Sequence, residues 1–162
     1  MPAATIPASN ANPSRLEPIT LFPSTTVTGT AAGSADSAAY GDPVNIESLK
    51  PVTAVQLELD VSAAAKEVGD TLDVAVQTSL DDTNWFDICA FTQVLGNGGA
   101  KRHIAKLDAS LAQATFEVAS ALSAGAIRNI IGRRLRVKYV TTNDADDPVD
   151  TSFTFSVHAV LL

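Results

Sequence analysis

Residues 55–61 read VQLELDV, with an apolar side chain at every second position and a polar or charged one between. Successive side chains of a β-strand point to opposite faces of the sheet, so this alternation places one face on a core and the other in water. The segment therefore predicts a half-buried β-strand.

The same alternation recurs at residues 72–78 (LDVAVQT), 135–139 (LRVKY) and 153–159 (FTFSVHA). Further strands are expected at residues 85–94 and 102–107. Turn-forming sequences separate the strands, at residues 67–70, 81–84, 96–99 and 143–148. Six or seven strands in about 110 residues predict an all-β domain, an antiparallel β-sandwich of jelly-roll or immunoglobulin-like type.

Residues 109–131 interrupt this pattern. Leu111, Thr115 and Val118 lie at helical spacing, whereas Phe116 and Val118 fit a strand equally well. We therefore expect one short helix or an irregular excursion near residues 109–131.

The first 50 residues differ in composition from the rest of the chain. They hold six of the eight prolines, and proline is incompatible with a helix interior or a central strand. We interpret residues 1–50 as an extended arm that touches a surface at intervals, with one edge strand near residues 17–28, and residues 51–162 as the sandwich domain. Simple disorder of the arm is the alternative. On this interpretation the domain folds without residues 2–45.

Composition limits the possible functions. The formal net charge is -7 and the isoelectric point about 4.6, so nucleic-acid phosphates would repel the chain unless its cations lay on one face. Cys89 is the only cysteine, which excludes an intrachain disulfide, and we expect a small buried side chain there. No signal-peptide pattern and no run of about 18 apolar residues is present, so we expect a soluble protein made in a cytoplasm.

The sequence offers no catalytic motif. His103 and His158 lie in separate predicted strands, and their spacing does not join them around a metal. The acidic loop at residues 144–150 resembles a calcium ligand set in composition, but it lacks the glycine and final glutamate of an EF-hand, which favours a solvated surface loop. Residues 96–99 (GNGG) form a turn, because no helix with a lysine and a hydroxyl follows them. We therefore predict that the protein is not an enzyme and uses no metal or cofactor.

Positive charge is concentrated in one segment. Residues 101–138 hold eight of the eleven basic residues against two acidic ones, so this segment has a net charge of +6 and the remainder -13. Adjacent strands could place these cations on one face, as a docking patch for an acidic protein surface. An ordinary solvated face is the alternative. Nucleic acid is not expected, because no aromatic side chains interleave with the cations.

Several of these stretches together resemble small structural proteins of tailed bacteriophages. The resemblance rests on residues 59–62 (LDVS) and 72–79 (LDVAVQTS), on the turn and tryptophan at 81–88 (DDTNWFDI), and on a last strand at 152–157 (SFTFSV). It covers roughly residues 52–162 and does not include the arm.

The resemblance implies a virion protein, made in the host bacterial cytoplasm, that binds the major capsid protein and reinforces the capsid as a decoration (cement) protein. It also implies a homo-oligomer, with a trimer favoured, and no nucleic-acid or membrane partner. The candidate docking residues are Ile19, Leu21, Phe22, Arg128, Arg133, Arg134, Arg136 and Lys138.

The alternative function is a carbohydrate-binding β-sandwich module of a phage tail or fibre. Such a module needs exposed aromatic side chains on which sugars stack, and the chain has few: one tryptophan, two tyrosines and six phenylalanines. We expect Trp85 to be at least half buried, which favours the capsid-binding interpretation.

Overall fold

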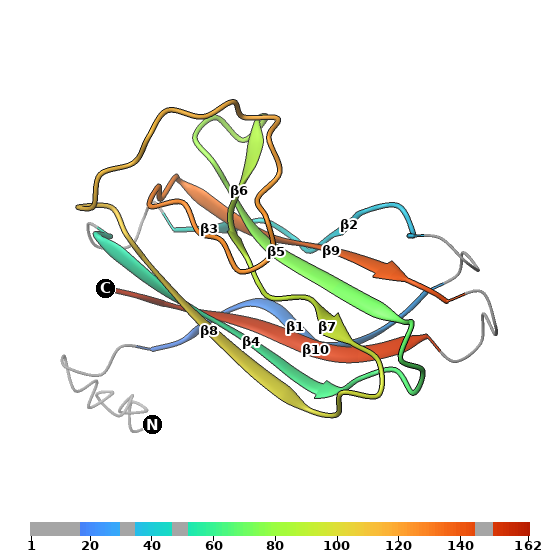
Figure 1. The fold of residues 1–162 in the computed structure, drawn as a ribbon. Helices are drawn as coiled ribbons and strands as arrows, with labels where there is room; N and C mark the ends of the chain where they lie inside the picture. The colour runs from blue at the N-terminus through green and yellow to red at the C-terminus, as the bar shows by residue number, and fades with distance from the viewer. Residues whose placement is uncertain (1–16, 30–34, 47–51, 145–150) are drawn as a thin grey trace, which may run out of the picture.

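The computed structural model describes residues 17–29, 35–46, 52–144 and 151–162 (Figure 1). Its strands are β1 (Ile19–Thr28), β2 (Ala39–Tyr40), β3 (Val44–Asn45), β4 (Ala54–Ala63), β5 (Thr71–Ser79), β6 (Trp85–Ala90), β7 (Val94–Leu95), β8 (Lys101–Asp108), β9 (Arg134–Thr142) and β10 (Ser152–Leu161). The residues described contain no helix, and so none long and apolar enough to cross a membrane.

The strands form two antiparallel sheets. The first sheet has the order β1-β10-β4-β8 and the second the order β2-β9-β5-β6, with β3 beside β9 and β7 beside β5 off the main path. Each segment with alternating apolar residues in the sequence is a strand of one of these sheets. The predicted all-β class and antiparallel sandwich are confirmed.

The strand order also identifies the topology. Without β3 and β7, the first strand pairs with the last, the second with the seventh, the third with the sixth and the fourth with the fifth. Such nested pairs arise when one long antiparallel hairpin is wrapped into two stacked sheets, which is the jelly roll. An immunoglobulin-like sandwich would instead place its first and second strands side by side.

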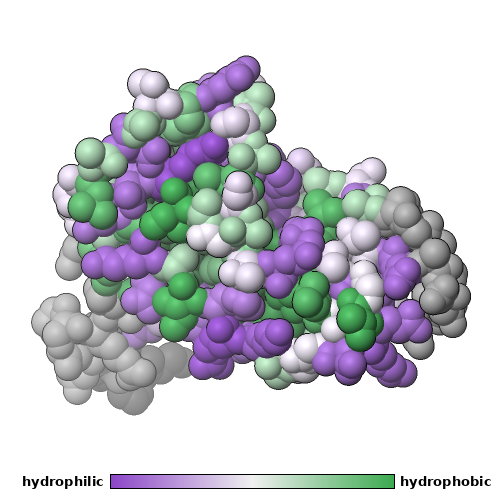
Figure 2. All heavy atoms as spheres, in the orientation of Figure 1, coloured by the Kyte–Doolittle hydropathy of each residue, from purple (hydrophilic) through white to green (hydrophobic). Residues whose placement is uncertain are grey.

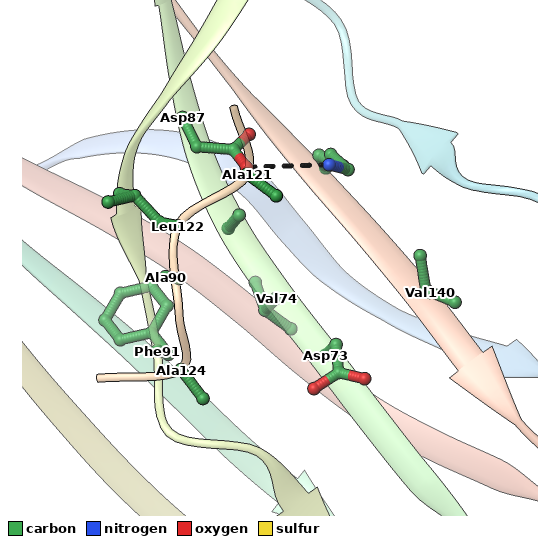
Figure 3. A pocket seen from close by; sticks show the side chains of 11 residues that line it. Asp73, Val74, Asp87, Ala90, Phe91, Ala121, Leu122, Ala124 and Val140 are labelled. Atoms are coloured by element: carbon green, nitrogen blue, oxygen red, sulfur yellow. Dashed lines mark ion pairs between the residues drawn. The ribbon is translucent and has the colours of Figure 1, made fainter. Parts of the chain in front are cut away.

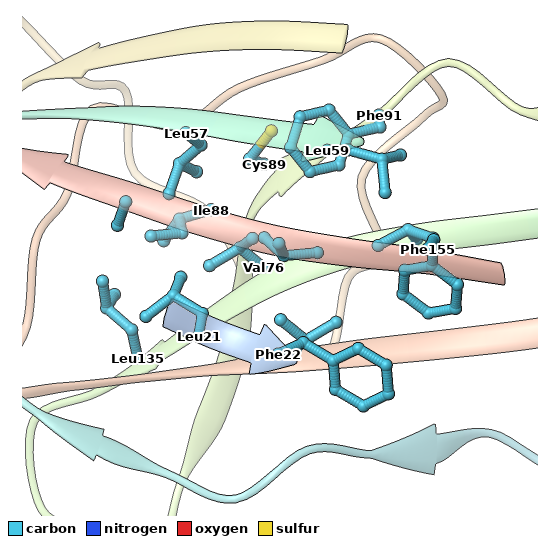
Figure 4. Close-up of a cluster of buried hydrophobic side chains, with 14 of the residues drawn as sticks. Leu21, Phe22, Leu57, Leu59, Val76, Ile88, Cys89, Phe91, Leu135 and Phe155 are labelled. Atoms are coloured by element: carbon cyan, nitrogen blue, oxygen red, sulfur yellow. The ribbon is translucent and has the colours of Figure 1, made fainter. Parts of the chain in front are cut away.

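The inward positions of the strands fill one core. In β4, Val55, Leu57, Leu59 and Val61 are all 0% exposed, as the alternation in residues 55–61 predicts. Figure 4 shows side chains from β4, β5 and β10 meeting between the sheets. Because complete burial of a valine or leucine side chain stabilises a fold by about 1.5–3 kcal/mol, β4 contributes strongly to the core.

Strand β1 belongs to the sandwich, although the sequence analysis assigned it to the arm. It pairs with β10 and buries Leu21, Phe22 and Val27. Pro23 lies at an edge of the sheet, where the register shifts after Phe22, and at such a position a missing N–H is tolerated. The predicted edge strand is therefore present, but deleting residues 2–45 would remove an outer strand and core side chains. Residues 1–16 of the predicted arm lie outside the described residues.

The segment between β8 and β9 is irregular. It lies along the edge strand β6 (Figure 1), where the N–H of Ala90 donates to Ala126 O (3.0 Å), the N–H of Gly125 to Ala90 O (2.8 Å) and the N–H of Arg128 to Ile88 O (2.8 Å). These bonds satisfy backbone groups that an open sheet edge would leave unpaired. Of the two alternatives for residues 109–131, the irregular excursion is the one formed.

Candidate functional site

Strand β9 places three predicted docking residues on one face of the molecule. Leu135 and Val137 point inward and are 0% exposed. Arg134, Arg136 and Lys138 alternate with them and lie on the outer face of the second sheet. This face is the candidate site.

Arg136 is held between two aromatic rings. The centre of its guanidinium group lies 4.2 Å from the ring centroids of both Tyr40, on β2, and Trp85, on β6. Its Nε donates to Gln77 Oε1 at 2.8 Å. Burial lowers the pKa of Arg136 below its ordinary value, partly offset by Tyr40 and Asp87, and the group stays cationic at neutral pH.

Polar side chains on β9, β5 and β6 are connected across the outer face of the second sheet. Gln77 lies opposite Arg136 on one side and Asp87 on the other. Its Nε2 donates to Asp87 Oδ1 at 2.8 Å, and Asp87 Oδ2 lies 3.6 Å from Lys138 Nζ. Asp87 is only 6% exposed, so these partners compensate a nearly buried carboxylate.

Arg128 attaches the irregular segment to the same face. It is 7% exposed; its Nη1 donates to Asp87 O at 3.0 Å, and its Nη2 donates to Ser120 O at 3.0 Å and Ser120 Oγ at 2.8 Å. Its guanidinium group also stacks on Phe116, 4.1 Å from the ring centroid. Because Arg128 is buried and its guanidinium group is engaged by these partners, it acts as an internal clamp and offers little surface for docking.

The other predicted docking residues differ in how they are placed. Arg134 Nε pairs with Asp82 Oδ1 at 2.9 Å, while Arg133 is exposed and its backbone N–H donates to Ser79 O. Ile19 is partly buried against the core, and Leu21 (3% exposed) and Phe22 (8%) are core residues that cannot contact a partner in the folded state. Most of the proposed docking set therefore interacts within this chain.

A pocket of about 210 Å³ opens between this face and the irregular segment (Figure 3). Its charged lining residues are Asp73, Asp87 and Lys138, and the rest of the lining is alanine, valine, leucine and phenylalanine. Lys138 pairs with Asp87, and Gln93 Nε2 lies 3.0 Å from both carboxylate oxygens of Asp73. Among the described residues, no serine, threonine, cysteine or histidine lines this pocket.

The remaining chemical candidates are dispersed. Within the described ranges, no three histidine, cysteine, aspartate or glutamate side chains surround a common point. His158 contacts Thr20 Oγ1 (3.3 Å) and Ser156 Oγ (3.2 Å), and His103 packs near Phe91. Burial raises the pKa of Cys89 to about 12, so this side chain is a buried thiol, as predicted. Residues 145–150 of the acidic loop lie outside the described residues.

Sequence reasoning missed Tyr40, Gln77 and Asp87 as parts of this face. The alternation of apolar and polar residues in their strands could have predicted that Gln77 and Arg136 lie on this face, because it places both side chains on the outward, polar side. Trp85 is partly buried, as expected, and lies at the sheet edge against Arg136.

The chain was compared with protein families, curated proteins and solved structures. No family model and no curated protein matches the chain. A chain in the solved structure of infectious bursal disease virus, Gx strain, is similar in fold, with a TM-score of 0.51 and 13% sequence identity. The match covers 90% of this chain and 31% of the viral chain, so this chain spans about a third of the length of that one. At this identity the two chains share a β-sandwich fold, and the comparison assigns this chain to no family.

Proposed function

We propose that this chain is a virion structural protein that binds the major capsid protein of a bacteriophage and reinforces the capsid as a decoration protein. The observation that supports it most is the jelly-roll sandwich, which matches a chain of a virus structure over 90% of the present chain. Jelly rolls recur in viral capsid proteins and also in lectins, so the surface has to support the choice.

The surface favours binding over catalysis. The polar groups of the outer face already donate to and accept from each other, so a reacting substrate would have to displace those partners. We therefore propose a protein that is not an enzyme and needs no cofactor. On the face seen in Figure 2, apolar side chains form separate spots between polar ones, which suits many weak contacts multiplied by symmetry.

We place the capsid contact on β8, because the cations of β9 are engaged within the chain. Strand β8 is the edge of the first sheet, and among the described strands only β4 pairs with it. Ile104 is 64% exposed on this strand, and Lys101 and Lys106 are exposed on either side of it. A strand of the capsid protein can add to such an edge through backbone hydrogen bonds, while the lysines attract an acidic surface.

Co-sedimentation of the purified full-length protein with phage particles that lack it tests this proposal. The wild type is expected to bind saturably, and Ile104→Glu is expected to bind weakly. Leu80→Glu is the matched control, because Leu80 is 57% exposed at a turn outside β8. Absence of wild-type binding contradicts the function, whereas equal binding by Ile104→Glu contradicts only the surface.

We also propose that the protein is a homo-oligomer, with a trimer as the expected state. Sedimentation equilibrium on the protein alone measures this. A monomer at all concentrations tested contradicts the proposed assembly.

A carbohydrate-binding module of a tail or fibre is the second candidate, and one observation favours it. Tyr40 is 51% exposed, and the guanidinium group of Arg136 lies between its ring and the ring of Trp85. One face of each ring is already covered by the guanidinium group, which leaves less area for a sugar. Sugar-specific binding on a glycan array, lost in Trp85→Ala, would reverse the ranking.

A further inference from the structure

Two buried polar residues at one end of the sandwich have groups without partners. Asp70, just before β5, is 1% exposed, and Asn143, just after β9, is 2% exposed. Within the described part of the chain, five buried side-chain atoms have no hydrogen-bond partner. Three of the five belong to these two residues: Asp70 Oδ2, Asn143 Oδ1 and Asn143 Nδ2.

The backbone brings the two residues together. Strands β5 and β9 pair at Thr71 and Thr142, the neighbours of Asp70 and Asn143. The N–H of Asp144 donates to Asp70 Oδ1 at 3.0 Å, so the Asp70 carboxyl group faces residues 143 and 144. This single bond leaves the second carboxylate oxygen uncompensated. No described lysine, arginine or histidine forms an ion pair with Asp70.

The side chain of Asp144 lies against Gly69, the residue that precedes Asp70. It is so close that a Cβ atom on Gly69 would overlap its carboxyl group. Asp144 is exposed whereas Asp70 is buried. A carboxylate in the interior is costly unless a cation or hydrogen-bond donors compensate it.

We propose that Asp70, Asn143 and Asp144 bind a calcium ion. The oxygen donors of these three side chains are carboxylate and amide oxygens, which suit a hard cation, and no cysteine or histidine is among them to favour zinc. Calcium accepts irregular arrangements of oxygen ligands and takes water molecules to complete its shell, whereas magnesium requires near-ideal octahedral geometry. The exposed Asp144 provides the path of entry. This site is independent of the proposed capsid role, and it departs from the sequence-based expectation that the chain uses no metal.

Isothermal titration of calcium chloride into the metal-stripped, full-length protein tests the site, with thermal denaturation in calcium and in a chelator as the second readout. The wild type is expected to bind one ion per chain and to melt at a higher temperature in calcium than in chelator, with a smaller effect of magnesium. Asp70→Asn is expected to weaken binding by about 100-fold, since even the loss of outer-shell partners costs roughly 10–100-fold in metal affinity.

The same variant also tests the predicted direction of a change in melting temperature. In chelator, Asp70→Asn is expected to melt above the wild type, because the amide removes a buried negative charge that has no counter-ion. Asp73→Asn is the matched control: Asp73 lies on the outer face of the same strand, and this variant should bind calcium like the wild type.

A wild type that neither binds calcium nor gains thermal stability from it overturns the proposal, and would assign the unpartnered atoms to water. Calcium binding that is unchanged in Asp70→Asn overturns it as well, because the ion would then bind elsewhere. If Asp70→Asn does not fold, Asn143→Ala replaces it, with the same loss of affinity expected.

Discussion

The substitution Phe22→Ala tests whether β1 is a structural strand or a segment kept for docking. Phe22 is 8% exposed and stacks on Phe155 of the same sheet, with ring centroids 4.9 Å apart. It also meets Tyr139 of the opposite sheet edge-on, at 5.4 Å. The ring therefore links the two sheets across the core.

The expected cost follows from these contacts. Truncating a buried phenylalanine to alanine typically costs about 3–5 kcal/mol. The site lies at a sheet edge, where neighbours relax more easily, so we expect the lower end, about 3 kcal/mol. At about 2–4 °C per kcal/mol for a chain of this size, the melting temperature should fall by about 6–12 °C.

Urea denaturation followed by circular dichroism and by Trp85 fluorescence measures the change. The midpoint should fall while the denaturant slope stays the same, since the same surface is exposed on unfolding. Tyr40→Ala is the matched control, because Tyr40 is 51% exposed and its loss removes mainly one stacking contact with Arg136, about 0.5–1 kcal/mol. A loss below about 1 kcal/mol in Phe22→Ala would refute the placement of β1 in the core.

Three further outcomes are expected. Arg136→Lys keeps the charge but loses the planar group between Tyr40 and Trp85. The free energy of unfolding should therefore fall by about 1–2 kcal/mol, and the fluorescence emission of Trp85 should shift to the red. Unchanged emission would contradict the stacking. Hydrogen bonds from Asn84, then Thr83, lower the pKa of Asp81, so its contribution to stability is present above the unfolded value and is lost as pH falls below about 4. Urea midpoints at about pH 6 and pH 3 should therefore differ less in Asp81→Asn than in the wild type, and an equal difference would exclude this carboxylate as the source. Cys89 should resist an aromatic disulfide reagent in the native state at about pH 8 and react once per chain in urea, since burial raises its pKa to about 12; rapid native reaction would show that its strand opens.

The elements of the fold follow from local sequence, whereas its topology does not. Alternation at residues 55–61, 72–78, 135–139 and 153–159 identifies four strands because each strand buries one face. Nothing local states that the strand at 153–159 lies between β1 and β4. Which strands become neighbours depends on how the inward side chains of distant strands fill the core. The alternation of apolar residues within one strand does not encode this.

Strand β1 illustrates a second limit. Proline at position 23 argues against a central strand, and the inference that this region lay outside the domain went one step further than the residue allows. The register shift after Phe22 accommodates Pro23, and buried side chains on both sides of it keep the strand in place. A proline restricts where in a sheet a strand lies, and does not exclude the strand from the core.

The charge of a segment and its availability to a partner are different quantities. The net charge of +6 in residues 101–138 is correct as arithmetic, but Arg134 and Lys138 pair with Asp82 and Asp87, which precede that segment in the sequence. An acidic capsid surface would have to exchange these pairs for new ones. The partly exposed Arg134–Asp82 pair contributes only about 0–1 kcal/mol in either setting, whereas breaking the Lys138–Asp87 pair would leave a nearly buried carboxylate without that partner. No net gain is therefore expected at β9.

The lysines of β8 differ in this respect. Lys101 and Lys106 are exposed and form no ion pair within the described residues, so attraction to an acidic partner does not require an ion pair of theirs to break. Such attraction acts mainly on the rate of association and weakens with salt. Lys101→Gln with Lys106→Gln should therefore slow binding to particles at low salt more than at high salt. The same change at Lys138 should have little effect on the rate, because Asp87 already neutralises that side chain.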